Sequence, residues 1–222
     1  MIAKLICLFV GYLFGTFQTG YFLAKSRGFD IRDHGSHSTG ATNSLRVMGT
    51  GAGVTVLIGD ALKAIIPCLV VRMIYRDQPG LWPLMLMWTG AGVIIGHCFP
   101  FYMGFKGGKG IASTVGVLIA LDIRIAILWA VVFFAFAIAS KYVSLGSIMA
   151  MTFVFFCQVF CLFRGLLVPG TVDPAFRIEY ALLAFVISGL AVWKHRSNIG
   201  RLLSGTESKV KVFTRGMDVG RK

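Results

Sequence analysis

Residues 104–110 read GFKGGKG, so two lysines stand among four glycines between apolar stretches. Lysine is costly to bury in a membrane and glycine weakens helices, so a membrane segment should avoid this composition. Glycine, however, lets backbone N–H groups close on an anion, and lysine supplies a point charge. The segment is therefore a candidate anion site at the N-terminus of a helix predicted over 111–121. The alternative is an ordinary cytoplasmic loop, with glycine for turning and lysine for topology.

This glycine-rich segment does not match a nucleotide P-loop. That motif requires a glycine six residues before the lysine and a serine or threonine directly after it. Met103 stands six residues before Lys109, and Gly110 follows the lysine. The mismatch excludes a P-loop ATPase.

Two further polar segments mix small residues with positive charge and hydroxyl or amide groups. They are DIRDHGSHSTGATNSLR at 30–46 and KHRSNIGRLLSGTE at 194–207. Such a set suits an anion with several oxygens, such as phosphate, because an arginine fork pairs with two oxygens. Two alternatives stay open: Thr42 or Asn43 as the N-cap of a helix, and a basic flank after the last membrane span. The candidates from all three segments are His34, Ser36, Ser38, Thr42, Asn43, Arg46, Lys106, Lys109, His195, Arg196, Asn198 and Arg201.

Charged residues also occur inside an apolar stretch, in GDALK at 59–63. A charge at the centre of a membrane helix costs ~2.5–3.5 kcal/mol on insertion scales, so it marks a functional candidate. Asp60 and Lys63 are three residues apart and can pair on one helix face. Structural pairing and support of a site are both open. His97, in IIGHCFP, is either a satisfied core histidine or a polar group at the mouth of the site.

The composition is that of an integral membrane protein. Of 222 residues 56% are hydrophobic, the mean hydropathy is +0.78, and only 14% are charged. Soluble domains average about 25% charged residues. The net charge of +13 is attributed to cytoplasmic loops, which collect Lys and Arg, and not to nucleic-acid binding. We expect an all-α protein with one polytopic membrane domain over 1–222 and a basic cytoplasmic tail at about 194–222.

The apolar stretches predict about seven transmembrane helices. Three large polar insertions, 25–50, 104–110 and 194–222, separate or follow them. The first stretch is interpreted as a span and not as a signal peptide, because it is too long and lacks a small-residue cleavage site. The predicted segments are 2–24, 52–75, 81–103, 111–121, 125–139, 143–163 and 178–193.

Charge and parity set the expected topology. The tail 194–222 carries eight Lys or Arg and two acidic residues, and 25–46 and 104–110 are also net basic. Basic loops stay cytoplasmic, so we expect these three segments inside and the N-terminus outside. An even number of crossings must then separate residues 110 and 194, which requires a break at Leu121–Arg124. The pieces have 11 and 15 residues. At ~1.5 Å per residue the first covers ~17 Å of a ~30 Å core, so short or half-depth helices are expected. Five spans with re-entrant pieces are the alternative.

The sequence lacks the motifs of several common catalytic mechanisms. It has no Ser-His-Asp triad in a readable order, no H-E-x-x-H, no paired-carboxylate signature and no metal-ligand cluster. It also lacks the His-x4-Asp element that many lipid acyltransferases use. The five cysteines form no C-x-x-C motif and are interpreted as small apolar core residues. We therefore expect neither a metal nor another cofactor.

Together these blocks resemble the motifs of the bacterial acyl-phosphate:glycerol-3-phosphate acyltransferase family (PlsY). Its first motif is similar to DIRDHGSHSTGATNSLR with FGTFQTGYFLAK before it, its second to GFKGGKGIAS preceded by GHCFP, and its third to HRSNIGRLLSGTE. GDALK and YVSLGSI also match in order and spacing. The resemblance extends from about Gly11 to Lys209.

The resemblance implies a reaction in bacterial phospholipid synthesis. A fatty acyl group passes from acyl phosphate to the sn-1 hydroxyl of glycerol 3-phosphate, giving lysophosphatidic acid and phosphate. It also implies seven transmembrane helices in the bacterial inner membrane, with the active site toward the cytoplasm. The expected partners are the two substrates and membrane lipid, without nucleic acid, and a monomer is one assembly that the sequence allows.

The resemblance also implies residue roles. Acyl phosphate is already activated, so direct transfer is expected, with His195 or the departing phosphate accepting the proton. The family usually has Gly and Asn after the first motif's serine, whereas this chain has His37 and Ser38, so no role is carried over there. The predicted catalytic residues are Ser36, Lys109, His195 and Asn198, and the predicted substrate-binding residues are Thr42, Asn43, Arg46, Lys106, Gly107, Gly108, Gly110, Arg196 and Arg201.

Two other functions are weighed against this one. A transporter or flippase for an anionic metabolite or lipid fits broken helices and a cationic site, but no internal repeat is visible and the polar groups collect on one face. A non-catalytic protein that binds anionic lipid through its tail is the third. Truncation after Gly205 is expected to weaken the lipid binder and to spare an enzyme whose site ends at Arg201.

Overall fold

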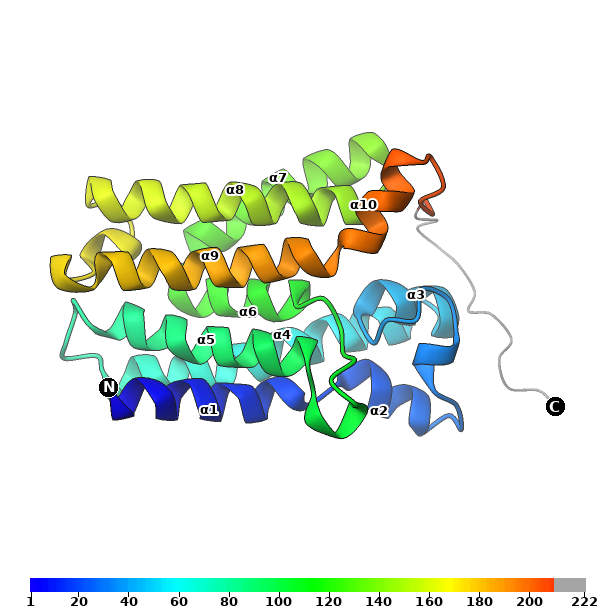
Figure 1. Cartoon of the computed structure of the whole chain (residues 1–222), viewed down its shortest axis with the longest axis horizontal. Helices are drawn as coiled ribbons and strands as arrows, with labels where there is room; N and C mark the ends of the chain where they lie inside the picture. The colour runs from blue at the N-terminus through cyan, green and yellow to red at the C-terminus, as the bar shows by residue number, and fades with distance from the viewer. Residues whose placement is uncertain (210–222) are drawn as a thin grey trace.

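The computed structural model describes residues 1–209, and this part is helical throughout, with no strand. The long helices run side by side, and the short helices α2, α3 and α10 gather at one end of the bundle, on the right of Figure 1. We call this end the site end. The α-helices are α1 (Ile2–Thr16), α2 (Thr19–Lys25), α3 (Ala41–Met48), α4 (Thr50–Ile74), α5 (Trp82–Cys98), α6 (Ile111–Leu121), α7 (Ile123–Ser140), α8 (Val143–Arg164), α9 (Arg177–Lys194) and α10 (Arg196–Leu203), with 3-10 turns at Ile31–Asp33, Phe101–Met103, Pro169–Thr171 and Pro174–Phe176.

Seven apolar segments follow one another, as predicted. Within residues 1–209, six are long and apolar enough to cross a membrane, and α6 is a shorter apolar helix of 11 residues. The prediction of a second short piece is wrong, because α7 has 18 residues and not 15. Among the seven apolar segments of residues 1–209, α6 alone is therefore too short to span a ~30 Å hydrocarbon core. Residues 210–222 of the predicted basic tail lie outside the described residues.

The predicted break between the fourth and fifth segments is confirmed at Asp122. This residue has an extended backbone and caps α7, since its carboxylate accepts from the N–H of Arg124 at 3.0 Å. The guanidinium of Arg124 pairs with the same carboxylate at 2.7 Å. The N–H of Val168 donates to it at 3.2 Å, which ties the loop after α8 to the break.

The first segment is broken, which differs from the continuous span predicted over 2–24. α1 ends at Thr16 and α2 begins at Thr19, with Phe17 and Gln18 in extended conformations. Side chains from other elements satisfy carbonyl groups at the break: Tyr102 donates to the Thr16 carbonyl at 2.7 Å and Lys63 to the Phe17 carbonyl at 2.5 Å. An irregular backbone at membrane depth requires such partners.

A short helix, α3, precedes the second long segment and is separated from it by Gly49. Gly49 has φ +90°, a conformation that favours glycine. α3 begins after its N-cap residue Gly40, which has no side chain to cap the helix. The alternative of Thr42 or Asn43 as N-cap is therefore wrong, and both side chains are available for other roles.

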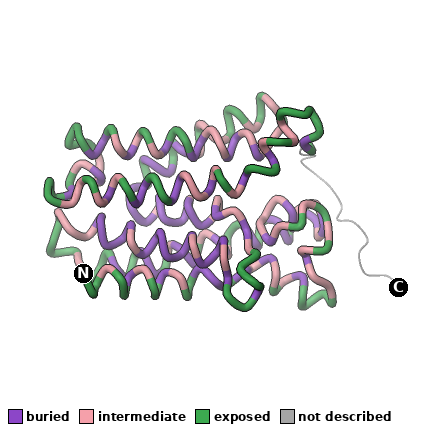
Figure 2. Tube along the Cα trace, in the orientation of Figure 1, coloured by how far each residue is buried: buried purple, intermediate pink, exposed green. Residues whose placement is uncertain are grey.

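Helix α5 forms the centre of the bundle, and Figure 2 shows it buried along its length. It packs most extensively against α1. Gly11 and Gly15 on α1 and Gly92 and Gly96 on α5 are two facing G-x-x-x-G motifs. A Cβ added at any of the four would lie 2.1–2.2 Å from a backbone oxygen of the other helix. The two backbones are thus in direct contact, the packing that small residues allow in membranes.

This contact predicts that Gly92→Ala destabilises the bundle. The added methyl group would meet the carbonyl oxygen of Leu8 at 2.1 Å, so α1 and α5 must separate. We expect a loss of ~1–3 kcal/mol, typical of overpacking, measured as a lower thermal midpoint in detergent. The matched control is Gly189→Ala on α9, where an added Cβ meets nothing within 4 Å. Equal midpoints for the two variants would contradict the close packing.

Candidate functional site

A cavity of about 570 Å³ opens at the site end, among α3, α4, α6, α7 and α8 and the start of α10. It draws lining residues from all three polar segments identified in the sequence, which confirms that these segments meet. Of the predicted site residues, those that line it are Ser36, Thr42, Asn43, Arg46, Lys109, Gly110, His195 and Asn198.

A chain of hydrogen bonds crosses the mouth of this cavity. The ammonium of Lys109 donates to Oδ1 of Asn198, and Nδ2 of Asn198 donates to Oε1 of Glu207 at 2.7 Å. Ser144 donates to the same oxygen at 2.8 Å, and Nε of Arg201 donates to Oε2 at 2.7 Å. Lys109 and Asn198, predicted together as catalytic residues, are therefore in direct contact.

The electrostatics of the mouth leave Lys109 titratable near neutral pH. Burial lowers the pKa of Lys109 to about 8, although the charge of Glu207 acts in the opposite direction. Burial raises the pKa of Glu207, but hydrogen bonds from Asn198, Ser144 and Arg201 outweigh it and leave that pKa below its ordinary value. At neutral pH the site thus holds a charged lysine beside a charged glutamate.

His195 lies at the junction of α9 and α10 and is buried. Its Nδ1 is 2.8 Å from the carbonyl oxygen of Ala191. A carbonyl can only accept, so Nδ1 carries the hydrogen and Nε2 keeps its lone pair. Burial, followed by the charge of Lys109, lowers the pKa of His195 to about 4. The imidazole is therefore neutral at physiological pH and can accept a proton or a hydrogen bond through Nε2.

Asn43 organises the serine-rich loop, a role in addition to the one predicted. Its Oδ1 accepts from the N–H of Ser36 at 2.7 Å, and its Nδ2 donates to the carbonyls of Ile31, His34 and Ser38 at 2.8–3.3 Å. Its Nδ2 and one acceptor position of Oδ1 are used within the loop, so Asn43 holds Ser36 at the cavity, which it also lines; its contact with substrate stays a prediction.

The two residues that depart from the family's first motif, His37 and Ser38, lie in different surroundings. His37 is exposed, has φ +56° and points Nδ1 to the carbonyl of Arg32 at 2.7 Å. Ser38, the next residue, lines the cavity. The unusual residue that faces the site is therefore a small hydroxyl side chain.

The glycine-rich segment contributes less directly than predicted. The N–H groups of Gly107 and Gly108 donate to the carbonyls of Cys98 and His97 at 3.2 and 3.1 Å, so they anchor the loop to the end of α5. Lys106 is exposed and does not line the cavity. Only Lys109 and Gly110 reach it. Gly110, with φ +82°, is the N-cap of α6, whose first N–H groups have no partner within the helix.

Two predicted arginines also lie outside the cavity lining. Arg196 is exposed, and its guanidinium carbon lies 4.3 Å from the centre of the Trp193 ring. Arg201 acts through Glu207. Sequence reasoning missed Glu207 as a site residue, although it stands in the third motif. Truncation after Gly205 would remove Glu207 and its hydrogen bond to Asn198, which argues against the expectation that this truncation spares the enzyme.

The remaining cavity wall is apolar. It comes from α4, α6 and α7 and includes Trp129 and Phe133, whose rings stack at 5.0 Å. Leu57, Ile58 and Phe134 are about half exposed, at 49%, 52% and 56%. This side of the cavity is therefore open to the outside of the bundle, where a membrane would place lipid.

Comparisons with known proteins agree with the site. The family model described as glycerol-3-phosphate acyltransferase matches residues 5–205. Relatives named glycerol-3-phosphate acyltransferase include one from Halalkalibacterium halodurans, 40% identical over 90% of this chain and 91% of its own. Another, from Shouchella clausii, is 37% identical over 95% of this chain and 98% of its own.

The chain belongs to the glycerol-3-phosphate acyltransferase family. It is similar to the crystal structure of PlsY (YgiH), an integral membrane glycerol 3-phosphate acyltransferase, in the glycerol 3-phosphate form. That match has a TM-score of 0.80 and 33% identity, and covers 94% of this chain and 96% of PlsY. The lysophosphatidic acid form gives a TM-score of 0.78. This glycerol-3-phosphate acyltransferase is thus a multi-pass membrane enzyme of phospholipid synthesis, and the transporter alternative is not needed.

The two shifted pKa values predict the pH dependence of the acyltransferase. If His195 is the proton acceptor it must stay neutral, so kcat/KM should fall as pH drops toward about 4. Lys109 must stay charged to hold an anion, so kcat/KM should also fall as pH rises past about 8. In Lys109→Arg the alkaline limb should move upward, because arginine stays charged. An unchanged alkaline limb in that variant would assign it to another group.

Proposed function

We infer that this acyltransferase uses acyl phosphate as its donor and acylates the sn-1 hydroxyl of glycerol 3-phosphate, giving lysophosphatidic acid and phosphate. The observation that carries this proposal is one cavity with a cationic, hydrogen-bonding mouth, a neutral buried histidine and an apolar wall open to lipid. Both substrates are phosphates and one has an acyl chain, so each part of the cavity has a use.

The phosphate groups bind at the mouth in this proposal. Lys109 and Arg46 supply positive charge, and Ser36 and Thr42 supply hydroxyl donors; all four line the cavity. The unpaired N–H groups at the start of α6 and its dipole add favourable potential for an anion. The titles of the similar PlsY structures, which name glycerol 3-phosphate and lysophosphatidic acid forms, support the same ligand chemistry here.

The reaction proceeds by direct transfer. The sn-1 oxygen attacks the acyl carbonyl carbon, a new C–O ester bond forms, and the bond from that carbon to the phosphate oxygen breaks. The proton of the hydroxyl passes to Nε2 of His195 or to the departing phosphate. Asn198, held between Lys109 and Glu207, positions the glycerol. Proximity and fixed positive charge provide the rate enhancement, without a metal or a covalent intermediate.

The acyl chain of the donor lies along the apolar wall. Leu57 and Ile58 on α4 and Phe134 on α7 are open to the outside of the bundle, so a chain can enter from the bilayer. Trp129 and Phe133 lie in the same wall, and Trp129 is buried. The bilayer thus surrounds the enzyme and also supplies this substrate.

In this proposal the site end faces the cytoplasm. Basic segments 25–46 and 104–110 lie at this end, and the positive-inside rule favours the cytoplasmic side for them. The N-terminus is then outside, and the enzyme acts as one polytopic domain, a monomer, in the bacterial inner membrane.

The first test follows phosphate release by the purified enzyme in detergent or lipidic mesophase. With palmitoyl phosphate and glycerol 3-phosphate together, we expect release of phosphate and formation of lysophosphatidic acid. Omission of either substrate, or replacement of palmitoyl phosphate by palmitoyl-CoA, should abolish product. Equal turnover with palmitoyl-CoA would refute the acyl-phosphate donor.

A second test compares two lysines of the same loop. Lys109→Ala removes the charge at the cavity and should lower kcat/KM by at least ~10²-fold, the scale of removing a preorganised electrostatic donor. Lys106→Ala removes an exposed lysine outside the cavity lining and should leave kcat/KM near the parent value. Similar activity of the two variants would remove Lys109 from the site.

A further inference from the structure

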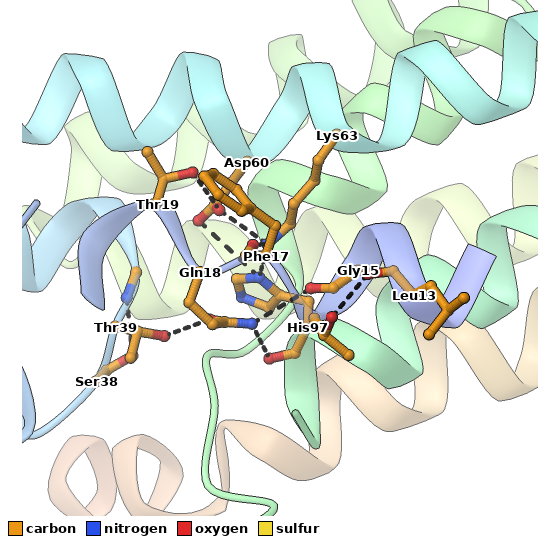
Figure 3. A network of polar contacts seen from close by, with 12 residues as sticks. Leu13, Gly15, Phe17, Gln18, Thr19, Ser38, Thr39, Asp60, Lys63 and His97 are labelled. Atoms are coloured by element: carbon orange, nitrogen blue, oxygen red, sulfur yellow. Dashed lines mark hydrogen bonds and ion pairs between the residues drawn. The ribbon is translucent and has the colours of Figure 1, made fainter. Parts of the chain in front are cut away.

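A buried polar network lies beneath the cavity, and the proposed reaction does not use it. Asp60 and Lys63 extend from α4 toward His97 on α5, as Figure 3 shows. The two charged groups pair at 2.9 Å, which confirms the predicted i,i+3 pair, and the side chains of Lys63 and Asp60 are only 5% and 2% exposed. Asp60 and His97 also reach the cavity lining. A charge at this depth is costly, so it marks a functional group.

The ammonium of Lys63 is fully satisfied. Its three N–H groups face three acceptors: a carboxylate oxygen of Asp60 at 2.9 Å, the carbonyl of Phe17 at 2.5 Å and Nδ1 of His97 at 2.7 Å. Thr19 donates to the same carboxylate at 3.1 Å. One cation therefore joins α4, α5 and the break between α1 and α2.

The contact with Lys63 fixes the imidazole of His97. An ammonium has no acceptor, so Nδ1 of His97 accepts and its hydrogen lies on Nε2. The Nε2 side of the ring lies against Gly108, where an added Cβ would come within 2.1 Å of Nε2. The N–H of Gly108 donates to the carbonyl of His97 at 3.1 Å. The ring and the backbone carbonyl of His97 thus both contact Gly108, the residue directly before Lys109.

The same network reaches the serine-rich loop. Gln18, in the break of the first segment, donates from Nε2 to the carbonyl of His97 at 3.0 Å. Its Oε1 accepts from the hydroxyl of Thr39 at 2.8 Å (Figure 3). Thr39 follows Ser38, which lines the cavity. The two loops that hold the anion-binding residues therefore rest on one buried set of contacts.

We propose that Asp60, Lys63 and His97 are positioning residues that hold the glycine loop in place and so fix the ammonium of Lys109 against Asn198. This role for the reaction rests on the proposed function of Lys109. Besides Asn198, the charged or titratable groups around Lys109 are Arg46 of α3, Lys194 and His195 at the end of α9, and Arg201 and Glu207. The network acts on Lys109 through the position of the loop.

The test removes the buried pair without changing the net charge, in the double variant Asp60→Asn/Lys63→Met. Neutral replacement of a buried ion pair often preserves stability, whereas a single change leaves an uncompensated charge. We expect a thermal midpoint near that of the parent, a raised KM for glycerol 3-phosphate and a kcat/KM lower by about 10²-fold, the scale of a small misplacement of a reacting group.

A second readout reports on Lys109 without using turnover. The rate of its modification by an amine-specific reagent is followed against pH by mass spectrometry in the full-length protein. The parent should titrate near pH 8, and the double variant should titrate nearer the ordinary lysine pKa of ~10.4. A purely structural role would lower the thermal midpoint and leave the titration of Lys109 in place.

The matched control is a second membrane ion pair, Lys4 with Glu179, whose charged groups lie 2.6 Å apart near the opposite end of the bundle. Lys4→Met/Glu179→Gln should leave the titration of Lys109 and the KM for glycerol 3-phosphate unchanged. A parent-like titration of Lys109 in Asp60→Asn/Lys63→Met would overturn the positioning role. A different outcome separates the two proposals. If Asp60→Asn/Lys63→Met shifts the titration of Lys109 but Lys109→Ala leaves turnover at the parent value, the proposed function of Lys109 is overturned and the positioning role stands.

Discussion

The positions of the two loops at the site depend on the buried ammonium of Lys63. A lysine inside a membrane bundle is tolerated only when its N–H groups meet acceptors, and here the three acceptors come from three elements. One of them, the carbonyl of Phe17, is available to Lys63 because the first span is interrupted at that point. The interruption in α1–α2, the charge on α4 and the histidine on α5 therefore form one connected set of contacts. The glycine-rich and serine-rich loops are hydrogen-bonded to this set.

The site itself is formed by the serine-rich and glycine-rich loops, in which many polar groups form hydrogen bonds within the protein. Asn43 and the N–H groups of Gly107 and Gly108 are occupied inside the protein. That use leaves a small set of candidate groups for substrates: the ammonium of Lys109, the Nε2 of His195, and the side chains of Arg46, Ser36 and Thr42. Preorganisation of this kind lets a small number of groups act strongly, because they need no rearrangement during the reaction.

Much of this architecture was predictable, for identifiable reasons. Apolar length and the even number of crossings located the helices and the break at Asp122, because charge and hydropathy act over whole segments. The break at Phe17 was missed because its cause lies on α4, far away in the sequence. Site residues were found by type, but the sequence does not show which polar groups are used internally. Glu207 was missed because its position depends on the turn after α10.

If the donor enters along the apolar wall at the half-exposed Leu57, Ile58 and Phe134, as proposed, the enzyme takes its two substrates from two phases. The relevant concentration of glycerol 3-phosphate is its amount per volume of water. For a lipidic donor it is the surface concentration in the bilayer, and the donor reaches the cavity by two-dimensional diffusion. Added inert lipid should therefore slow the reaction by surface dilution while the total amounts of enzyme and donor stay constant. For such a protein the Michaelis constant of the lipid substrate is a mole fraction.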